Sequence, residues 1–395
     1  MKIICPKELC SGCTACESIC THDAIRMQAD NAGFLFPMVD EDKCVNCKLC
    51  EKVCPVINEV PRKEPMHSYV AVASDNEEQI SSTSGGIASA LARYIIEVKN
   101  GIVYGCTGEN CQHVRHIRID NTNDINRLKG SKYVQSAITG IYQSVRDDLR
   151  AGKTVLFIGT PCQVAGLKSY LRKDYLNLYS VDFVCHGVPS QKMLSDHVEE
   201  LKLRDNAEKV LFRHKRKGKG VKFSLSVFNK SGSVLYRKPY GVDQYLSGFM
   251  LGLFYRDSCY ACKFAASKRV SDITIGDYWD KNKEFGILGN GADGLSQMNI
   301  NTEKGSSLVN ELGDRIIYMP IELQKLLKHS QQLKEPMKPH KNRRLFMQLY
   351  PIDGFKRACE TAMASNYKVF RKQRLLNTLL LIPGTRLIYK KIKGQ

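Results

Sequence analysis

The chain of 395 residues is too long for a small electron carrier alone and suggests two or three domains. Its 43% hydrophobic content is ordinary for a globular protein. Sixteen cysteines without an N-terminal export signal indicate a reducing cytoplasm, where thiols serve metals rather than disulfides. We expect no transmembrane helix, because no apolar run reaches about 18 residues.

The net charge of +19 is unevenly placed. Residues 321–395 hold 17 Lys and Arg against four Asp and Glu. An acidic protein, an anionic membrane surface or nucleic acid could each match such a region. A solvated basic face is the simpler alternative.

Eight cysteines near the N-terminus form two runs of the spacing C-x2-C-x2-C-x3-C, and Pro55 follows the second run. This spacing is typical of bacterial two-cluster ferredoxins, in which the fourth cysteine of each run ligates the other cluster. We therefore predict one 4Fe-4S cluster at Cys10, Cys13, Cys16 and Cys54, and a second at Cys44, Cys47, Cys50 and Cys20. Thr21 departs from the pattern, since proline usually stands there, but it is no ligand. A zinc site or a disulfide framework is the alternative, although zinc usually takes two pairs of cysteines.

After the ferredoxin unit, residues 59–66 are rich in proline and charge and predict a linker. The apolar run at 69–73 predicts a strand. Residues 85–98 have helical spacing of apolar side chains, and 102–104 predict another strand.

A strand at 154–158, a helix at 163–171 and a strand at 179–184 predict a βαβ unit with parallel strands. An antiparallel excursion follows, then one more strand, and beyond about residue 310 a helical, basic region. The segments expected as strands in this part are 209–212, 223–228, 233–236 and 272–276.

Cys162 and Cys185 each lie just past a strand of that βαβ unit. Open α/β sheets place ligands at the carboxyl ends of parallel strands, and neighbouring strands lie about 4.8 Å apart. The pair Cys259 and Cys262 follows, so a third cluster could have four ligands.

Each of these cysteines also has a plainer interpretation. Cys162 or Cys185 alone would be a small buried side chain. Cys259 and Cys262 alone could be half a zinc site or a redox pair. Four further cysteines have no evident partner and are expected to be plain thiols: Cys5, Cys106, Cys111 and Cys359.

Several short segments between about Tyr69 and Glu303 resemble, in order, the beta-subunit family of coenzyme F420 hydrogenases and dehydrogenases. They are SSTSGGI at 81–87, KGSKYVQS at 129–136, GTPCQVAG at 159–166, CHGVP at 185–189, FRHKR at 212–216, CYAC at 259–262 and IGDYW at 275–279. The resemblance implies FAD and a 4Fe-4S cluster in this domain, with the cluster at Cys162, Cys185, Cys259 and Cys262. It also implies electron transfer between clusters, flavin and a second substrate, which is the deazaflavin coenzyme in archaeal members and other molecules elsewhere.

The same resemblance assigns flavin contacts, which we predict at Ser84, Gly85, Gly86, Lys129, Ser131, Lys132, Gln135 and Thr160. Glycines at a helix start let a phosphate approach free N–H groups. Lys129, Ser131 and Lys132 offer cations and a hydroxyl to a pyrophosphate. A plain turn and an exposed basic loop are the alternatives. The Gly-x-Gly-x-x-Gly pattern is absent, which disfavours a Rossmann-type NAD site.

Two further features stay open. The basic run from Arg213 to Lys222 could contact an anionic substrate or an acidic partner, or be a solvated hairpin. His186 could tune a cluster through hydrogen bonding to its ligand shell. It could equally be a core histidine.

We predict an α+β or α/β protein with a two-cluster ferredoxin domain at 1–58, a linker at 59–67, an FAD and 4Fe-4S domain at 68–310 and a basic, mainly helical region at 311–395. The expected function is an iron–sulfur flavoprotein oxidoreductase that takes electrons from a ferredoxin-like or other redox donor. The alternative is a non-catalytic electron-transfer subunit. No nucleic-acid-binding module is recognisable.

The expected location is the cytoplasm, with a peripheral place at the membrane conceivable for the tail. Residues 371–393 carry an apolar patch between cations, as interfacial segments do. Packing of that patch, Leu375 to Ile382, against the main domain is the competing expectation.

Overall fold

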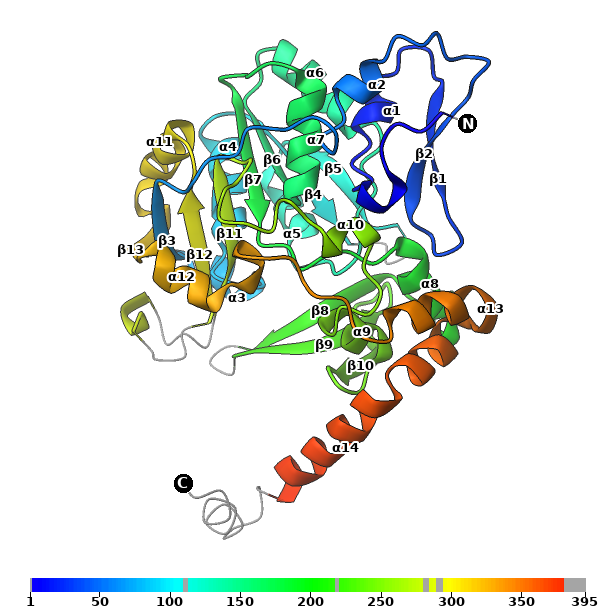
Figure 1. Ribbon diagram of the computed structural model, residues 1–395. Coiled ribbons are helices and arrows are strands. Elements are labelled where there is room, and N and C mark those ends of the chain that lie inside the picture. The colour runs from blue at the N-terminus through cyan, green and yellow to red at the C-terminus, as the bar shows by residue number, and fades with distance from the viewer. Residues whose placement is uncertain (1, 109–112, 217–219, 280–283, 289–293, 380–395) are drawn as a thin grey trace.

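The computed structural model describes residues 2–108, 113–216, 220–279, 284–288 and 294–379 (Figure 1). A small N-terminal unit lies beside a large mixed sheet flanked by helices, and a second, three-stranded sheet with further helices lies below them in this view. The mixed α/β character expected from the sequence is confirmed.

The N-terminal unit is a pseudo-repeat. Strands β1 (Ile25–Ala29) and β2 (Leu35–Val39) pair antiparallel. The short helices α1 (Ala15–Ile19) and α2 (Leu49–Lys52) each carry the third cysteine of one run, and η1 (Lys7–Leu9) precedes the first run. The cysteines themselves form much of this unit's interior, together with a few aliphatic side chains.

The central sheet has eight strands in the order β13-β3-β12-β11-β7-β6-β4-β5. Their bounds are β3 (His67–Ala73), β4 (Ile102–Thr107), β5 (Arg115–Ile119), β6 (Val155–Gly159), β7 (Leu178–Phe183), β11 (Ile273–Tyr278), β12 (Leu295–Ile300) and β13 (Ile316–Pro320). Each strand predicted in this region is present, and β6 and β7 are parallel as expected.

Three strands of this sheet were not predicted. β12 is fully buried yet holds Ser296, Gln297 and Asn299, so it lacks the apolar run that marks a central strand. β13 lies within the region expected to be helical beyond about residue 310, and that expectation is wrong for these five residues. β5 is an edge strand in which three of the five residues are Arg or His, so it lacks an apolar run.

Strand direction gathers five carboxyl ends at one edge of the sheet. β4, β6, β7 and β11 are parallel to their neighbours in that group. β12 is antiparallel to β11, and β3 is antiparallel to β12, so β3 runs with the parallel group. Ligand sites of open α/β sheets lie at this edge.

Helices cover both faces of the sheet. Alternate strand residues, such as Val103 and Leu156, pack with α4 and α11, whereas Tyr104 and Phe157 pack with α6 and α7. The bounds are α3 (Asn76–Ser81), α4 (Ile87–Glu97), α5 (Ile125–Leu128), α6 (Ile141–Arg150), α7 (Pro161–Leu171), α11 (Glu303–Leu312) and α12 (Leu323–His329). Short 3-10 turns are η2 (Thr122–Asp124), η3 (Gly286–Leu288), η4 (Gly313–Arg315) and η5 (Gln331–Leu333).

The predicted antiparallel excursion is a separate sheet, ordered β10-β9-β8. Its strands are β8 (Lys209–Arg216), β9 (Gly220–Phe228) and β10 (Val234–Pro239), and the helices near it are α8 (Gln191–Glu200), α9 (Gln244–Met250), α10 (Asp257–Tyr260), α13 (Arg343–Ala362) and α14 (Ala364–Leu379). A buried aromatic group that includes Phe254, Phe346 and Phe355 joins α13 to this part. Gly354 kinks α13 with φ 81°.

The C-terminal helix α14 projects away from the rest of the chain (Figure 1). Val369 and Leu375 are 60% and 63% exposed, so Leu375 does not pack against the main domain. The rest of the predicted interfacial patch, from residue 380 onward, lies outside the described residues. No helix in the described part of the chain is both long and apolar enough to cross a membrane.

Candidate iron–sulfur and flavin site

Four cysteines of the N-terminal unit converge as predicted, and we call them the buried set: Cys10, Cys13, Cys16 and Cys54. Burial raises the pKa of the Cys16 thiol well above its ordinary value, and the neighbouring thiols of the other three raise it further. Cys13 and Cys16 flank the start of α1, while Cys54 arrives from the end of α2. The Cys54 thiol of the second run therefore lies with thiols of the first run, and the crossed ligation stays a prediction.

Cys5 is a fifth thiol at this place, which the sequence reasoning missed. Its thiol is hydrogen-bonded to those of Cys10 and Cys54, and these contacts raise the pKa of Cys5. Cys5 lies outside the repeated spacing, so no pattern marked it. Only the fold of the N-terminal segment beside η1 brings it there.

The other four N-terminal cysteines line one small cavity of about 20 Å³, and we call them the outer set: Cys20, Cys44, Cys47 and Cys50. Lys2, His22 and Lys48 also line this cavity. Cys47 is exposed, and Cys20 and Cys44 are half-buried. The outer set thus reaches solvent, whereas Cys10, Cys13 and Cys54 of the buried set do not.

The third predicted group also comes together at the carboxyl edge of the sheet, and we call it the sheet set: Cys162, Cys185, Cys259 and Cys262. Cys162 is in the first turn of α7, and Cys185 follows β7. Burial raises the pKa of the Cys185 thiol well above its ordinary value, and Cys259, Cys162 and Cys262 raise it further.

A buried ion pair fixes the segment that carries Cys262. Arg269 Nη2 lies 2.8 Å from Asp182 Oδ1, and both side chains are almost fully buried. Arg269 Nη1 also donates to the carbonyls of Phe264 and Ala266, just after Cys262. Asp182 is on β7, three residues before Cys185, so this pair ties the loop after Cys262 to the strand that leads to Cys185.

The buried set and the sheet set meet at helix α7. A Cβ placed on Gly166 would lie 2.9 Å from Cys13 Cβ and 3.1 Å from Cys13 Sγ. Cys162 is four residues earlier on the same helix, about 6 Å along its axis. Cys13 therefore touches α7 about one turn from Cys162.

Four thiolates are the ligands that a 4Fe-4S cluster takes, and each of the three sets offers four thiols. Among the residues that the structure describes, no three His, Cys, Asp or Glu side chains are placed to hold one metal ion. A zinc ion draws four ligands to about 2.3 Å from one centre, whereas a cubane holds its four thiolates at separate corners. None of the 15 described cysteines is in a disulfide, so the framework alternative fails for them; Cys111 lies outside the described residues.

Two loops that we predicted as flavin contacts lie side by side at the same edge of the sheet. The Ser131 amide donates to Thr83 Oγ1 at 3.0 Å. Lys129 Nζ donates to Ser81 Oγ at 2.8 Å and pairs with Glu78 Oε1 at 2.9 Å.

Most polar groups of these loops are engaged within the protein. Ser84 Oγ donates to the Leu295 carbonyl, and the Gly85 amide donates to Ser296 Oγ. A Cβ on Gly85 would lie 2.5 Å from the Ala71 carbonyl oxygen, so this glycine allows backbone packing against β3. Lys132 Nζ donates to two backbone carbonyls of the preceding turn. Gly86, with φ +87°, starts α4.

The remaining two predicted flavin contacts lie beside the thiols. Thr160 caps α7 through the Gln163 amide, and its Oγ1 is 3.1 Å from Cys162 Sγ. Gln135 Nε2 donates to the Ser11 carbonyl, between Cys10 and Cys13. Their polar groups are thus placed next to the sheet set and the buried set.

The first basic side chains of the run from Arg213 to Lys222 make hydrogen bonds within the protein. Arg213 Nη2 donates to Asp277 Oδ2 at 2.6 Å, and its Nε donates to the Tyr133 hydroxyl. Lys215 Nζ donates to three carbonyls of the 79–84 segment. Lys222 is exposed, and residues 217–219 lie outside the described residues. The solvated-hairpin alternative is therefore wrong for Arg213 and Lys215.

His186, which follows Cys185, is exposed, so its interpretation as a core histidine is wrong. Its ring centroid lies 6.4 Å from that of Phe249. His186 therefore presents a polar ring beside the sheet set.

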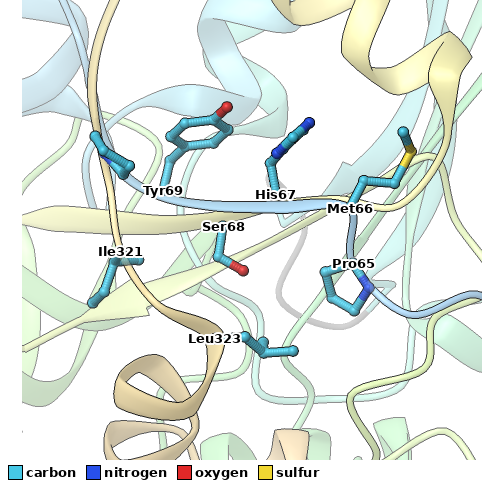
Figure 2. A pocket seen from close by; sticks show the side chains of 8 residues that line it. Pro65, Met66, His67, Ser68, Tyr69, Ile321 and Leu323 are labelled. Carbon is cyan, nitrogen blue, oxygen red and sulfur yellow. The ribbon is translucent and has the colours of Figure 1, made fainter.

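A cavity of about 250 Å³ lies elsewhere (Figure 2). It is lined by Pro65, Met66, His67, Ser68, Tyr69, Pro320, Ile321 and Leu323. These residues lie at the amino end of β3 and just after β13, the opposite edge from the cysteines. This cavity is not part of the candidate site.

Two segments of the chain match models of known protein families. Residues 152–322 match the family model for the C terminus of the beta subunit of coenzyme F420 hydrogenase/dehydrogenase, and residues 9–58 match a 4Fe-4S dicluster domain. The predicted family resemblance is confirmed. The matched segments contain all twelve cysteines of the three sets.

Two curated relatives are similar to this chain, one over most of it and one over less than half. The coenzyme F420-dependent sulfite reductase of Methanocaldococcus jannaschii is 24% identical over 85% of this chain and 51% of its own length. The F subunit of the F(420)H(2) dehydrogenase of Methanosarcina mazei is 19% identical over 40% of this chain and 46% of its own. The chain thus spans about half the length of these relatives.

The chain is also similar to a chain in a solved structure of the F420-reducing [NiFe] hydrogenase complex from Methanosarcina barkeri. The similar part covers 72% of this chain and 92% of that chain, at 19% sequence identity and a TM-score of 0.47.

Proposed function

We propose that the protein is an iron–sulfur flavoprotein oxidoreductase that passes electrons from a ferredoxin-like donor, through three 4Fe-4S clusters and FAD, to a substrate. The observation that supports this most is the position of Cys13 on Gly166 of α7, one turn from Cys162. Electron transfer needs closely spaced centres, and this contact puts ligands of two sets side by side.

The three sets suggest an order along the route. The outer set reaches solvent at Cys47 and would meet the donor. The buried set shares the N-terminal unit with it and lies against the main domain. The sheet set lies at the carboxyl edge of the sheet, next to the two loops that would hold the flavin.

Burial of the thiols fits ligation by iron. Burial raises the pKa of Cys13 and Cys259 to about 12 and of Cys162 to about 11, so these thiols carry protons when iron is absent. Iron ligands must be deprotonated, so cluster assembly would release those protons. A 4Fe-4S cluster supplies one-electron transfer when bound.

For FAD, the support is the contact between the Ser81–Gly86 loop and the Lys129–Lys132 loop. Because Ser84, Gly85 and Lys132 already have partners, binding would require them to exchange those partners for the phosphates. Bound flavin supplies the exchange between one-electron and two-electron chemistry. Exposed His186 would face the space beside the sheet set.

The names of the relatives make coenzyme F420 the first substrate to test. Those names, a sulfite reductase and part of an F(420)H(2) dehydrogenase, belong to the relatives, and this chain spans about half of each. The second candidate is an electron-transfer subunit that serves a separate enzyme. The exposed outer set is compatible with both.

The test is anaerobic reconstitution with iron, sulfide and FAD, followed by quantification. We expect about 12 iron atoms, from three cubane clusters, and one FAD per chain. About eight iron atoms without flavin would contradict the proposal and leave a ferredoxin module.

Two variants locate the third cluster. Cys162→Ser and Cys259→Ser should each lose about four iron atoms while the N-terminal pair remains, because its ligands come from another unit. Cys359→Ser, in the buried core of α13, is the control and should keep all the iron. Full iron content in both ligand variants would refute the sheet set.

A further inference from the structure

Arg256 is an arginine buried at the junction between the N-terminal unit and the main domain. Its side chain is 1% exposed. Among the described residues, its side chain donates to three neutral acceptors: Gln135 Oε1 at 3.1 Å, the Cys10 carbonyl at 2.9 Å and the Leu35 carbonyl at 2.6 Å. A buried charge without a neutralising partner is costly, so a nearby negative group is expected to compensate it.

The side chain of Arg256 faces the buried set. The Cys10 carbonyl that it binds belongs to a member of that set. A Cβ on Gly12 would lie 2.7 Å from Arg256 Nη2, so the loop between Cys10 and Cys13 folds directly over the guanidinium. The rings of Phe34 and Phe36 lie 5.3 Å and 4.6 Å from Cζ and keep water away.

The backbone of Arg256 is hydrogen-bonded to the segments that carry Cys185 and Cys259 of the sheet set. The Arg256 amide donates to the Val188 carbonyl, three residues after Cys185. The Cys259 amide donates to the Arg256 carbonyl at the start of α10. Gln135 also connects the two sets. Its backbone amide donates to the Pro189 carbonyl, four residues after Cys185, and its side chain donates to the Ser11 carbonyl, next to Cys10.

The charge of Arg256 is thus held between the two sets. Its guanidinium donates to the Cys10 carbonyl, and its backbone carbonyl accepts from the Cys259 amide.

We propose that Arg256 is a positioning residue that joins the ligand loops of two neighbouring clusters and raises the reduction potential of both. This inference rests on the proposed function. Reduction adds one negative charge to a cluster, and a positive charge held nearby at low dielectric favours the reduced form. The contacts of Arg256 run to Cys10 of the buried set and Cys259 of the sheet set, so the cluster of the outer set should not respond.

The test is a potentiometric titration of the full reconstituted chain, followed by electron paramagnetic resonance. In Arg256→Met we expect lower midpoint potentials for the clusters of the buried set and the sheet set, with the outer cluster unchanged. Arg256→Lys keeps the charge without the planar fork and should retain most of the wild-type potentials.

Lys7→Met is the matched control, because Lys7 Nζ lies 4.8 Å from the same Phe36 ring but its side chain is 67% exposed. It should shift none of the three potentials. If Arg256→Met does not assemble its clusters, Gln135→Glu is the variant that tests the proposal. It places a carboxylate against the intact guanidinium of Arg256, and it should lower the midpoint potentials of the same two clusters.

Three clusters with unchanged potentials in Arg256→Met, or in Gln135→Glu where only that variant assembles, would overturn the role of Arg256 and leave the proposed function intact. Equal shifts in all three clusters would also overturn it, because the effect would then be global. A wild-type chain with about eight iron atoms would instead refute the proposed function itself.

Discussion

The two halves of the N-terminal unit share one backbone and differ in what covers them. Gly12 and Asn46 occupy the same position in the two cysteine runs, and both have left-handed φ, 65° and 55°. Thr14 and Lys48 match in the same way, with φ 63° and 61°. Asn46 accepts a hydrogen bond from Lys2 in an exposed setting, whereas Gly12 lies under Arg256 and Gln135. The half that holds Gly12 is covered by the main domain, whereas the half that holds Asn46 is exposed there.

We expect the largest loss of folding stability from a variant in the main domain, in the part that carries the sheet set. Asp182→Ala leaves the buried Arg269 without its partner, and breaking such pairs costs about 3–5 kcal/mol. Urea unfolding of the reconstituted protein, followed by circular dichroism, measures it. Glu199→Ala is the control, because its pair with Arg204 is more than half exposed and is worth less than about 1 kcal/mol. Equal effects in the two variants would contradict this account.

A pH dependence should follow from the network behind α7. Burial lowers the pKa of His116 to about 4, and its Nδ1 contacts Ser136, which accepts from Gln163 of α7. Since the unfolded chain binds this proton near pH 6.5 and the folded chain only near 4, the contribution of neutral His116 is complete above pH 6.5 and is lost as pH falls toward 4.

The loss should reach about 3 kcal/mol, from 1.36 kcal/mol per pKa unit. Urea unfolding between pH 4 and 7 should show a shallower slope in His116→Gln than in the wild type. Parallel curves would show that His116 does not titrate as described.

The contact at α7 should be sensitive to one methyl group. Gly166→Ala places a Cβ 2.9 Å from Cys13 Cβ and 2.7 Å from the Tyr142 hydroxyl, and such overpacking costs about 1–3 kcal/mol. We also expect loss of iron from the buried set. Gly232→Ala is the control, because a Cβ there meets no described atom within 4 Å, although its φ of 81° adds a small strain. Wild-type stability and iron content in Gly166→Ala would mean that the unit does not dock on α7.

Exchange of the paired positions tests the comparison between the halves directly. Gly12→Asn should destabilise by about 1–3 kcal/mol, since the left-handed φ suits asparagine but Arg256 and Gln135 leave no room. Asn46→Gly should change stability by less than about 0.5 kcal/mol, because that position is exposed. Thermal unfolding of both variants gives the difference, and similar shifts would show that the halves are equally free.

Much of this arrangement could be predicted from local pattern. The eight N-terminal cysteines follow a fixed spacing, and the βαβ unit around Cys162 and Cys185 shows clear periodicity. The strand β12 could not be predicted, because its buried Gln297 and Asn299 look like loop residues until the sheet surrounds them.

The contacts between the N-terminal unit and the main domain could not be predicted from the sequence either. Cys5, Gly166 and Arg256 each have a contact that decides their role with a residue more than 40 positions away in sequence: Cys54, Cys13 and Cys10, respectively. Spacing rules describe residues within one loop, and no rule of that kind links Arg256 to Cys10. The flavin contacts, taken from motif resemblance, stay predictions.

The central claim is that the cluster of the buried set lies between the other two. Electron paramagnetic resonance of the fully reduced, reconstituted chain tests it most directly, compared with the Cys162→Ser variant. The account predicts a wild-type spectrum broadened by magnetic interaction among three clusters, and a two-cluster spectrum in the variant. A wild-type spectrum equal to the variant's spectrum plus an isolated, unbroadened third signal would contradict it.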